Sequence, residues 1–369
     1  MKLFKNFLKI GDLISHFSWD VGVDLGSNNT LIYLKERGIV ADEPTMMARL
    51  KRKRWTGLSA PKTNQLTAIA YGFRAKEMLN REPRQIEVIS PLKNGIISDL
   101  EAIESMISYH LRMVYEIPSK YPKIFKPRVI VGVPGSINDV QKRAVRASFL
   151  SAGVREVIMI EESVLAAIGV GLPVERTSGL AIVDVGGGKT EVNVISMGGV
   201  VVGKGSKIAG NSLDNNIANY IKMKYGILIG QNSAEKIKIE VGNLLENSEE
   251  TKKVTLVRGR DLETGLPKSI KIGESEIREA IIMEVRKIVR LVSEVLDETP
   301  PELMNDILKR GILLVGNGSK IKGLDRLIEA ETKISTRIAD DPGMSVIKGC
   351  GELIENQNLL KTIKLISAY

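Results

Sequence analysis

The sequence predicts an α/β fold made of two duplicated halves. Stretches with strand periodicity alternate with stretches of helical periodicity in both halves of the chain, which is the pattern of α/β proteins. A strand, an Asp-x-Gly turn and a second strand over residues 20–34 recur over residues 180–199, and a repeat at this domain-sized distance indicates an internal duplication. At 369 residues the chain also exceeds one ordinary core, so we expect two or three packed units.

The composition is that of a folded protein, with 43% hydrophobic and 26% charged residues. The net charge of +9 suits a nucleic acid, an acidic membrane surface or solubility alone, but only 4% of the residues are aromatic, which argues against base stacking. We therefore expect no nucleic-acid partner. The single cysteine, Cys350, excludes an internal disulfide and a cysteine-rich metal site, and the whole pattern favours the cytoplasm.

The N-terminal residues predict an amphipathic helix over residues 1–17. Its apolar face includes Phe4 and Phe7, and the opposite face carries three lysines, Lys2, Lys5 and Lys9. Such a helix is typical of the surface of an acidic membrane, and the alternative is a terminal helix packed on its own core. The apolar residues are too interrupted for a signal peptide, and no segment of the chain is long and apolar enough to span a membrane.

The two Asp-x-Gly motifs predict a pair of phosphate-binding hairpins. The first is DLGSNNT at residues 24–30, and the second is DVGGGKT at residues 184–190. Glycine allows backbone N–H groups to approach a phosphate closely, although a tight turn between two strands is the alternative for either motif alone. Facing one another, two such hairpins would hold β- and γ-phosphates, with Asp24 and Asp184 reaching Mg²⁺ through water.

Three further segments continue the alternation of strands and helices. Residues 127–153 predict a strand, a Pro-Gly-Ser turn and a helix whose N-cap is Ser136 or Asn138. Residues 154–171 predict a strand that runs directly into a helix, with Glu161 and Glu162 at the junction. A buried strand then ends in a Gly-x-Gly sequence, and a helix follows from about residue 322. Backbone of this kind passes flat beside an adenine ring or a phosphate.

These motifs, in this order and spacing, resemble the actin, Hsp70-type chaperone and sugar-kinase superfamily. Within it the chain resembles the MreB family of bacterial actins, from about Asp20 to about Glu355. The segments that carry the resemblance are DLGSNNTLIY, IEESVLAAIGVGLPV, DVGGGKTEVNVIS, ILIGQNSAEKIKIEVG, VRGRDLETGLPKSI and ADDP. Of these, VRGRDLETGLPK is the most specific to the family. The resemblance implies two duplicated lobes with four subdomains around a central nucleotide cleft.

The resemblance also implies where the subdomains begin and end. After the amphipathic helix of residues 1–17, subdomain IA takes residues 18–44, 92–163 and 337–369. Subdomain IB takes residues 45–91. The second lobe divides into subdomain IIA, with residues 164–203 and 266–336, and subdomain IIB, with residues 204–265.

ATP and Mg²⁺ are the cofactors that the resemblance implies, with Asp24 and Asp184 as the metal-side carboxylates. The implied phosphate and cleft residues are Gly26, Ser27, Asn28, Asn29, Thr30, Gly186, Gly187, Gly188, Thr190 and Gly210. Glu235 and Lys238, three apart on one helix, resemble the residues that hold the ribose, although by themselves they suit an ordinary solvated salt bridge. The adenine strand corresponds to Gly316, Asn317 and Gly318.

Two residues carry the expected chemistry. By the resemblance, Glu162 orients the water that attacks the γ-phosphate; the alternative is a favourable charge at a helix N-terminus. Lys189 stands where the family mostly has threonine, and either stabilises phosphate charge or pairs with Glu162. We expect retained ATP binding and a weakened ATPase, with ADP and phosphate formed slowly. Three further departures from the family are Asn94, Ser163 and Asn211.

The resemblance implies self-assembly into head-to-tail filaments, paired antiparallel, on the inner face of the plasma membrane. Their role would be to determine cell shape together with other shape or cell-wall proteins. Ile124 and Phe125, flanked by lysines, suit a second membrane contact; a basic loop with a buried Phe is the alternative. Two other functions remain open: an ATP-binding scaffold without turnover that serves shape or motility without a wall, and a small-molecule kinase, for which no convincing Asp base is found.

Overall fold

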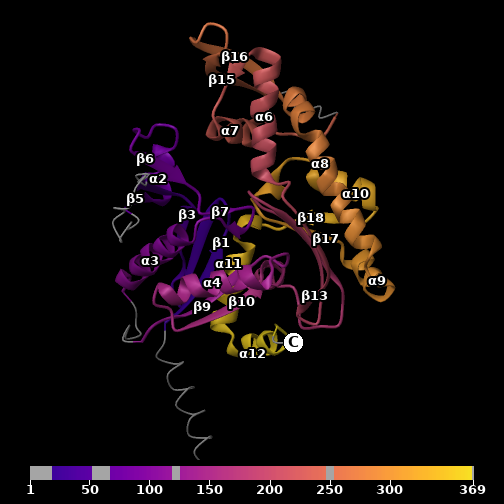
Figure 1. Ribbon diagram of the computed structural model, residues 1–369. Helices are drawn as coiled ribbons and strands as arrows, with labels where there is room; N and C mark the ends of the chain where they lie inside the picture. Colours follow the sequence, from indigo (N-terminus) through magenta and orange to yellow (C-terminus); the bar gives the residue numbers. More distant parts are fainter. Residues whose placement is uncertain (1–18, 52–66, 119–124, 247–252, 368–369) are drawn as a thin grey trace, which may run out of the picture. The chain divides into compact units, whose positions relative to one another are not determined.

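The computed structural model describes residues 19–51, 67–118, 125–246 and 253–367 (Figure 1). The amphipathic helix expected over residues 1–17 and the side chain of Ile124 lie outside these ranges. Within them, no helix combines the length and the apolarity needed to cross a membrane. The chain forms two compact units, which are described separately. Unit 1 comprises residues 1–133, 137–165 and 347–361, and unit 2 comprises residues 134–136, 166–346 and 362–369.

Unit 1 is built on a five-stranded sheet with the order β10-β9-β1-β2-β3 (Figure 1). β1 pairs antiparallel with β2 and parallel with β9, β2 is antiparallel to β3, and β9 is parallel to β10. β9 is buried along its whole length, as expected for a parallel strand covered on both faces. The strands are β1 (Asp20–Leu25), β2 (Asn29–Leu34), β3 (Gly38–Pro44), β9 (Arg128–Val133) and β10 (Glu156–Glu161).

Smaller elements complete unit 1. They are a sheet of β4 (Met47–Leu50), β5 (Ala68–Tyr71) and β6 (Ile86–Ile89), the pair β7 (Leu92–Lys93) and β8 (Ile96–Ile97), and the helices α2 (Gly72–Met78), α3 (Leu100–Glu116) and α4 (Asp139–Ser151). α3 contributes buried Ile103, Ile107 and Leu111 to the core under the main sheet. Of the two candidate caps for α4, the structure uses Asn138, which exchanges hydrogen bonds with Gln141 in a capping box.

The sheet of unit 2 repeats the design of unit 1, with the order β13-β12-β11-β17-β18. The first three strands are antiparallel, and β11, β17 and β18 are parallel, so each strand has a counterpart in the other unit. Even the register irregularity between the second and third strands recurs, at Ile32/Tyr33 and at Val194/Ile195. The strands are β11 (Leu180–Val185), β12 (Thr190–Ser196), β13 (Gly199–Ser206), β17 (Ile312–Val315) and β18 (Thr336–Ile338).

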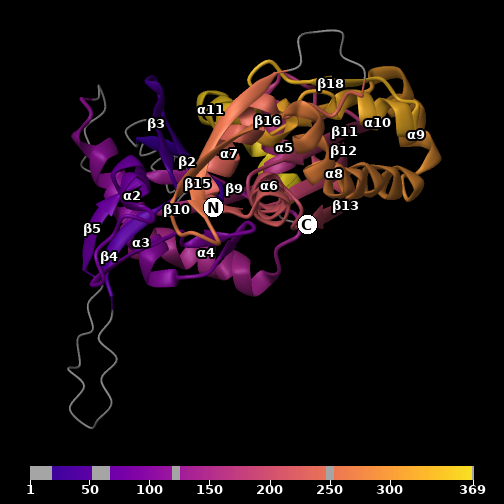
Figure 2. The same cartoon turned by 90° about the horizontal axis from the view of Figure 1, so that it is seen from above.

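Helices and a second sheet surround this core of unit 2. The elements are α6 (Gly210–Tyr225), α7 (Gln231–Val241), α8 (Glu274–Asp297), α9 (Pro301–Arg310), α10 (Leu324–Thr332), the 3₁₀ turns η1 (Asn317–Lys320) and η2 (Pro342–Met344), and β14 (Ile227–Leu228), β15 (Val254–Asp261) and β16 (Pro267–Gly273). α8 lies along β12 and β13 and packs through Ile281, Val285 and Ile288 (Figure 2). The helix expected from about residue 322 begins at Leu324, after η1.

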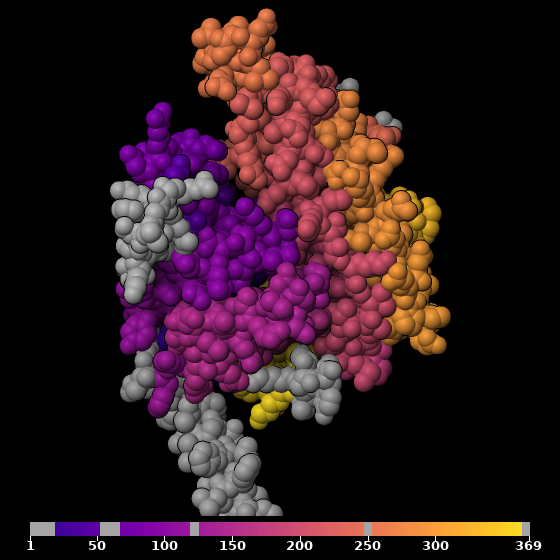
Figure 3. Space-filling model, viewed as in Figure 1, coloured from indigo at the N-terminus to yellow at the C-terminus, as the bar shows by residue number. Residues whose placement is uncertain are grey.

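The family-specific segment VRGRDLETGLPK forms the hairpin between β15 and β16, which projects from unit 2 (Figure 3). Asp261 closes its turn by accepting hydrogen bonds from the N–H groups of Glu263 and Thr264 and by pairing with Lys268 at 2.8 Å. These partners, Lys268 first, hold the pKa of Asp261 well below its usual range. Gly259 leaves no room for a Cβ, which would lie 2.6 Å from the carbonyl oxygen of Leu228.

Three helices begin in one unit and end in the other: α5 (Glu162–Gly169), α11 (Ser345–Glu355) and α12 (Gln357–Ser367). Inside unit 1, the start of α5 touches α11 without any side chain between them. A Cβ at Gly349 would lie 1.9 Å from the carbonyl oxygen of Leu165. A glycine is therefore required at this point of close approach.

Stability in unit 1 is expected to depend on pH through His110. This side chain is buried on α3, and neither ring nitrogen has a hydrogen-bond partner among the described residues. Burial lowers the pKa of His110 from 6.5 to about 4. The unfolded chain therefore takes up a proton between these two pH values and the folded chain does not, so stability is lost as pH falls below 6.5. The expected loss between pH 7.5 and pH 5 is about 2 kcal/mol.

Urea unfolding of the wild type and of His110→Leu at these two pH values checks this expectation. The variant should lose less stability on acidification, by about the same 2 kcal/mol. Equal acid sensitivity of the two proteins would contradict it.

Candidate functional site

The first hairpin lies in unit 1, where β1 ends and β2 begins. Leu25 pairs with Thr30 across the turn, and a Cβ at Gly26 would lie 2.6 Å from the carbonyl oxygen of Asn29. The hydroxyl of Thr45 donates to the carbonyl oxygen of Gly26 at 2.7 Å. The turn is therefore tight because of its own backbone, and a neighbouring strand-end residue fixes it in place.

Side chains of this first hairpin are also held. The hydroxyl of Ser27 accepts a hydrogen bond from the backbone N–H of Gly95 at 2.8 Å, and the hydroxyls of Thr30 and Thr45 lie 2.9 Å apart. Asn29 donates to Asp42 Oδ1 at 2.6 Å. Ser27 and Asn29 are half-buried.

The second hairpin lies in unit 2 and has the same construction. Val185 pairs with Thr190, and the backbone N–H of Gly186 donates to the carbonyl oxygen of Lys189 at 2.9 Å. A Cβ at Gly186 would lie 3.2 Å from that oxygen, the counterpart of the contact at Gly26 in the first hairpin. The two Asp-x-Gly motifs therefore form equivalent turns, as the duplication predicts.

The N-terminus of α6 packs on the glycines of the second hairpin. The N–H groups of Gly210 and Asn211 donate to the carbonyl oxygens of Gly186 and Gly187, at 3.1 and 2.7 Å. The carbonyl oxygens of Gly186 and Gly187 are therefore used in hydrogen bonds to α6. Within the described ranges, the N–H groups of Gly187 and Gly188 donate to no protein acceptor. Adjacent unused N–H groups in a turn form a concave site suited to an anion.

Lys238 supplies a fixed positive charge beside this helix start. Its ammonium group pairs with Asp214 Oδ1 at 2.8 Å and donates to the carbonyl oxygen of Gly210 at 3.0 Å. Asp214 is almost fully buried and Lys238 is largely buried. The ion pair of Lys238 is thus with Asp214 on α6, a partner that the sequence analysis did not single out. Glu235 is half-buried on the same helix as Lys238.

The Gly-x-Gly segment lies directly against the second hairpin. Gly316 has a left-handed φ of 79°, and a Cβ there would lie 2.4 Å from both Asp184 Oδ1 and the carbonyl oxygen of Val185. At Gly318 a Cβ would lie 2.6 Å from the Val185 side chain. The side chain of Asn317 between them packs against Gly343, where a Cβ would lie 2.4 Å from Asn317 Oδ1. Both glycines are therefore needed for the approach of η1 to the end of β11.

Substitution of Gly316 by alanine is expected to destabilise unit 2 by about 2–3 kcal/mol, because a φ of 79° with a ψ of 150° is a backbone conformation essentially restricted to glycine and because the new Cβ overlaps its neighbours. The matched control is Gly226→Ala, since Gly226 has a φ of 65° but no atom within 4 Å of its ideal Cβ. The control should lose only about 1 kcal/mol. Urea unfolding measures both, and equal losses would show that the contact with Asp184 and Val185 is unimportant.

Lys189 is paired with Glu191. The two charged groups are 2.7 Å apart, and the Glu191 side chain is 3% exposed. The other oxygen of Glu191 accepts from the hydroxyl of Ser136 at 2.9 Å and from its backbone N–H at 3.3 Å. The sequence predicts phosphate charge or Glu162 as the partner of Lys189, and the pairing with Glu191 is not among these predictions. The spacing of two along the start of a strand was the available signal, since such residues share a face.

Glu162 and Asp24 both belong to unit 1, and both act electrostatically on the same buried thiol. β10 ends at Glu161 and α5 begins at Glu162, which is 6% exposed. Burial raises the pKa of the Cys350 thiol, and the carboxylates of Asp24 and Glu162 raise it further. Asp24 of the first hairpin and Glu162 at the start of α5 are therefore both within electrostatic reach of one buried thiol on α11.

Two sheets of the same strand order, each with an Asp-x-Gly hairpin between its first two strands, define an actin-like protein. The sequence profile described as MreB/Mbl protein matches residues 18–362. The chain belongs to the MreB/Mbl family. The fold class and the family expected from the sequence are thus confirmed.

Relatives and solved structures agree with this assignment. The chain is 41% identical over 339 residues to the cell shape-determining protein MreB of Escherichia coli strain K12, covering 92% of this chain and 94% of that protein. MreB5 of Spiroplasma citri, bound to ADP or to AMPPNP, has a TM-score of 0.83 at 32% identity and covers 94% of this chain and 98% of its own. The MamK double helical filament, at 19% identity and a TM-score of 0.73, supports the fold alone; it covers 92% of this chain and 99% of its own.

Proposed function

We propose that this protein is an ATP-binding cytoskeletal protein that assembles into filaments and determines cell shape. The observation that carries the proposal is the second hairpin, where the unused N–H groups of Gly187 and Gly188 form an anion site beside the buried Lys238. MreB of Escherichia coli is named as cell shape-determining, and MreB5 of Spiroplasma citri was solved with ADP and with AMPPNP. The first name supports a role in cell shape here, and the second supports nucleotide binding.

In this proposal the phosphates are bound by the two hairpins. Backbone N–H groups of Gly187 and Gly188 in the second hairpin hold phosphate oxygens, and Ser27, Asn28 and Asn29 are the phosphate-binding residues of the first hairpin. Asp24 and Asp184 suit Mg²⁺ held through water, since both are carboxylates at the ends of equivalent strands. Lys238 and Glu235 hold the ribose, and the backbone of residues 316–318 passes beside the base.

Hydrolysis is proposed to be slow. Glu162 would orient the attacking water, which is the main task that phosphoryl transfer leaves to a protein side chain. Lys189, however, adds no hydroxyl to the site, and its ammonium group is anchored by Glu191, which also accepts a hydrogen bond from Ser136. This anchoring also favours a second candidate, a filament that binds ATP as an assembly ligand with no turnover. Phosphate release measured on sedimentable polymer separates the two.

The filaments are proposed to lie on the cytoplasmic face of the plasma membrane, as paired antiparallel strands of subunits in contact with other shape or cell-wall proteins. The amphipathic pattern of residues 1–17 supports membrane attachment. Phe125 supports it as well, because this large apolar side chain is 41% exposed beside Lys126. The four subdomains are proposed to begin and end at the residues that the family resemblance implies.

The test uses Gly187→Pro, which removes one of the unused N–H groups, and Gly187→Ala, which keeps it. Hydrogen bonds to charged groups contribute roughly 1.5–3 kcal/mol, so the proline variant should bind a fluorescent ATP analogue with Mg²⁺ at least about tenfold more weakly than the alanine variant. Unfolding of both variants without nucleotide controls for folding. Wild-type pelleting should require ATP, and pelleting that ignores nucleotide would overturn the proposal.

A further inference from the structure

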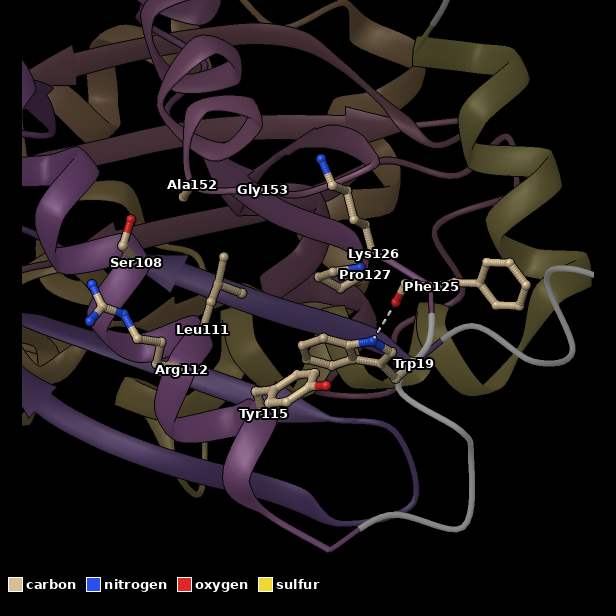
Figure 4. A pocket seen from close by; sticks show the side chains of 10 residues that line it. All are labelled: Trp19, Ser108, Leu111, Arg112, Tyr115, Phe125, Lys126, Pro127, Ala152 and Gly153. Atoms are coloured by element: carbon tan, nitrogen blue, oxygen red, sulfur yellow. Dashed lines mark hydrogen bonds between the residues drawn. The ribbon is translucent and has the colours of Figure 1, made fainter.

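Unit 1 contains a cavity of about 390 Å³ that no part of the proposed nucleotide site uses (Figure 4). α3 contributes Ser108 and Arg112 to its lining, the end of α4 contributes Ala152, and the chain that leads into β9 contributes Lys126 and Pro127. A space of this size is in the range of small-ligand sites in proteins. Its chemistry therefore indicates which ligand it accepts.

One wall of the cavity is aromatic and fixed. The indole N–H of Trp19 donates to the carbonyl oxygen of Phe125 at 2.8 Å, as Figure 4 shows. The ring of Tyr115 meets the Trp19 ring edge-on, with centroids 6.0 Å apart. Trp19 is buried, whereas Tyr115 and Phe125 are 56% and 41% exposed. The wall thus runs from the interior to an open, aromatic rim, the type of surface that sits at a membrane interface.

The charge of the lining has a single sign. Arg112 and Lys126 are both exposed, and among the described residues no acidic side chain contributes to the cavity. Neither cation makes an ion pair or hydrogen bond with any residue in the described ranges. A guanidinium and an ammonium group beside an apolar wall are complementary to a phosphate that carries a hydrocarbon substituent.

The position of the cavity along the chain points to the source of such a ligand. Trp19 directly follows residues 1–18, and Phe125 directly follows residues 119–124. Both stretches combine lysines with large apolar residues in sequence, the composition of segments that bind acidic membranes. The cavity is therefore lined by residues that directly adjoin both stretches in sequence, Trp19 after the first and Phe125 with Lys126 after the second.

We propose that this cavity binds the phosphate headgroup of an anionic glycerophospholipid. Arg112 and Lys126 hold the phosphate, and the glycerol and the first acyl carbons lie against Trp19 and Tyr115. The proposal rests on the membrane association proposed above and deepens it, because it turns a general attraction to acidic surfaces into a site for one lipid headgroup.

The direct test removes the membrane surface from the measurement. Trp19 and Trp55 are the two tryptophans of the chain, so Trp55→Phe leaves Trp19 as the only indole reporter. Titration of this variant with a short-chain phosphatidylglycerol below its micelle concentration should change Trp19 emission in a saturable way. Adding Arg112→Gln and Lys126→Gln should weaken binding about tenfold or more.

The matched control carries Arg84→Gln and Lys142→Gln, which make the same charge change in unit 1 outside the cavity lining. It should bind the short-chain lipid like the parent protein. An equal response to short-chain phosphatidylcholine, or an equal loss in the control, would overturn the headgroup site. Inorganic phosphate that competes as strongly as the lipid would overturn a lipid as the ligand.

Vesicle sedimentation separates the failure of this site from the failure of membrane association. Wild-type protein is expected to pellet with phosphatidylglycerol vesicles, and the cavity variant to pellet less than the control variant. If the wild type binds no vesicles, the proposed membrane association is wrong and the site falls with it. If the cavity and control variants pellet equally, membrane association stands and the site is wrong. A change of Trp19 emission on removal of residues 1–17, without any response to lipid, would assign the cavity to that segment.

Discussion

Replacing Arg128 with alanine is expected to destabilise unit 1 by roughly 3–5 kcal/mol, because it leaves a buried carboxylate without its cation. Asp20 is 1% exposed at the start of β1. The guanidinium of Arg128, at the start of β9, contacts both of its oxygens, at 3.2 and 2.5 Å, and also donates to Gln357 Oε1 at 3.2 Å. One side chain therefore joins two adjacent strands and the first turn of α12.

Urea unfolding followed by tryptophan fluorescence measures this effect. Arg155→Ala is the matched control, since Arg155 is an exposed arginine of the same unit. It should change stability by no more than about 0.5 kcal/mol. The double variant Asp20→Ala/Arg128→Ala should be more stable than the sum of the two single losses predicts, because it removes the uncompensated charge. A loss below 1 kcal/mol in Arg128→Ala, or additive losses in the double variant, would contradict the expectation.

Replacing Lys189 with threonine is expected to speed phosphate release from ATP, by roughly tenfold or more. The substitution puts a hydroxyl at the position where the family mostly has one and removes an ammonium group that Glu191 anchors at 2.7 Å. It also leaves the buried Glu191 with Ser136 as its one side-chain partner among the described residues, so part of the gain is offset by lower stability. Nucleotide binding itself should be retained.

Lys189→Met is the control for this experiment. Like Lys189→Thr, it removes the ammonium group that pairs with Glu191, but it adds no hydroxyl. It should therefore lose the same stability without a faster release of phosphate. Phosphate release is measured together with ATP-dependent pelleting for all three proteins. Slower release in Lys189→Thr than in the wild type would show instead that the lysine takes part in hydrolysis.

The sequence predicts the outline of the fold because its signals are local. Each hairpin is encoded by a strand, an Asp-x-Gly turn and a strand, and the two strand pairs β1–β2 and β11–β12 form with the same register. The junction of β10 with α5 at Glu162 and the Asn138 cap of α4 are local as well. In such places, turn and capping chemistry over a few residues decides the structure.

The partners of the polar side chains could not be predicted, because they come from distant parts of the chain. Lys238 pairs with Asp214, which lies on another helix, and Glu191 receives hydrogen bonds from Ser136, 55 residues away. Asp20 finds Arg128 only because β1 and β9 are neighbours in the sheet. Periodicity and turn signals specify elements, whereas these contacts depend on how the elements pack.

The close contacts of the site glycines could not be predicted from the sequence either, because they also depend on how the elements pack. From the sequence alone, the glycine at position 316 has many possible explanations, including contact with a ligand. In the structure the space beside Gly316 is filled by Asp184 and Val185 of the protein itself. A glycine in a phosphate-binding motif thus indicates that another group lies close to the backbone. Only the structure shows whether that group belongs to a ligand or to the protein.

Because Cys350 is buried, its rate of alkylation can report how often unit 1 opens locally. The thiol is wholly inaccessible on α11, next to Gly22 of β1, and burial raises its pKa, so an alkylating reagent reaches it only when the helix detaches from the sheet. Because the chain has no other cysteine, the alkylation rate of the unmodified protein reports the frequency of that opening without any engineered label. The same rate, followed while ATP or lipid is added, would show which ligand tightens the contact between α11 and β1.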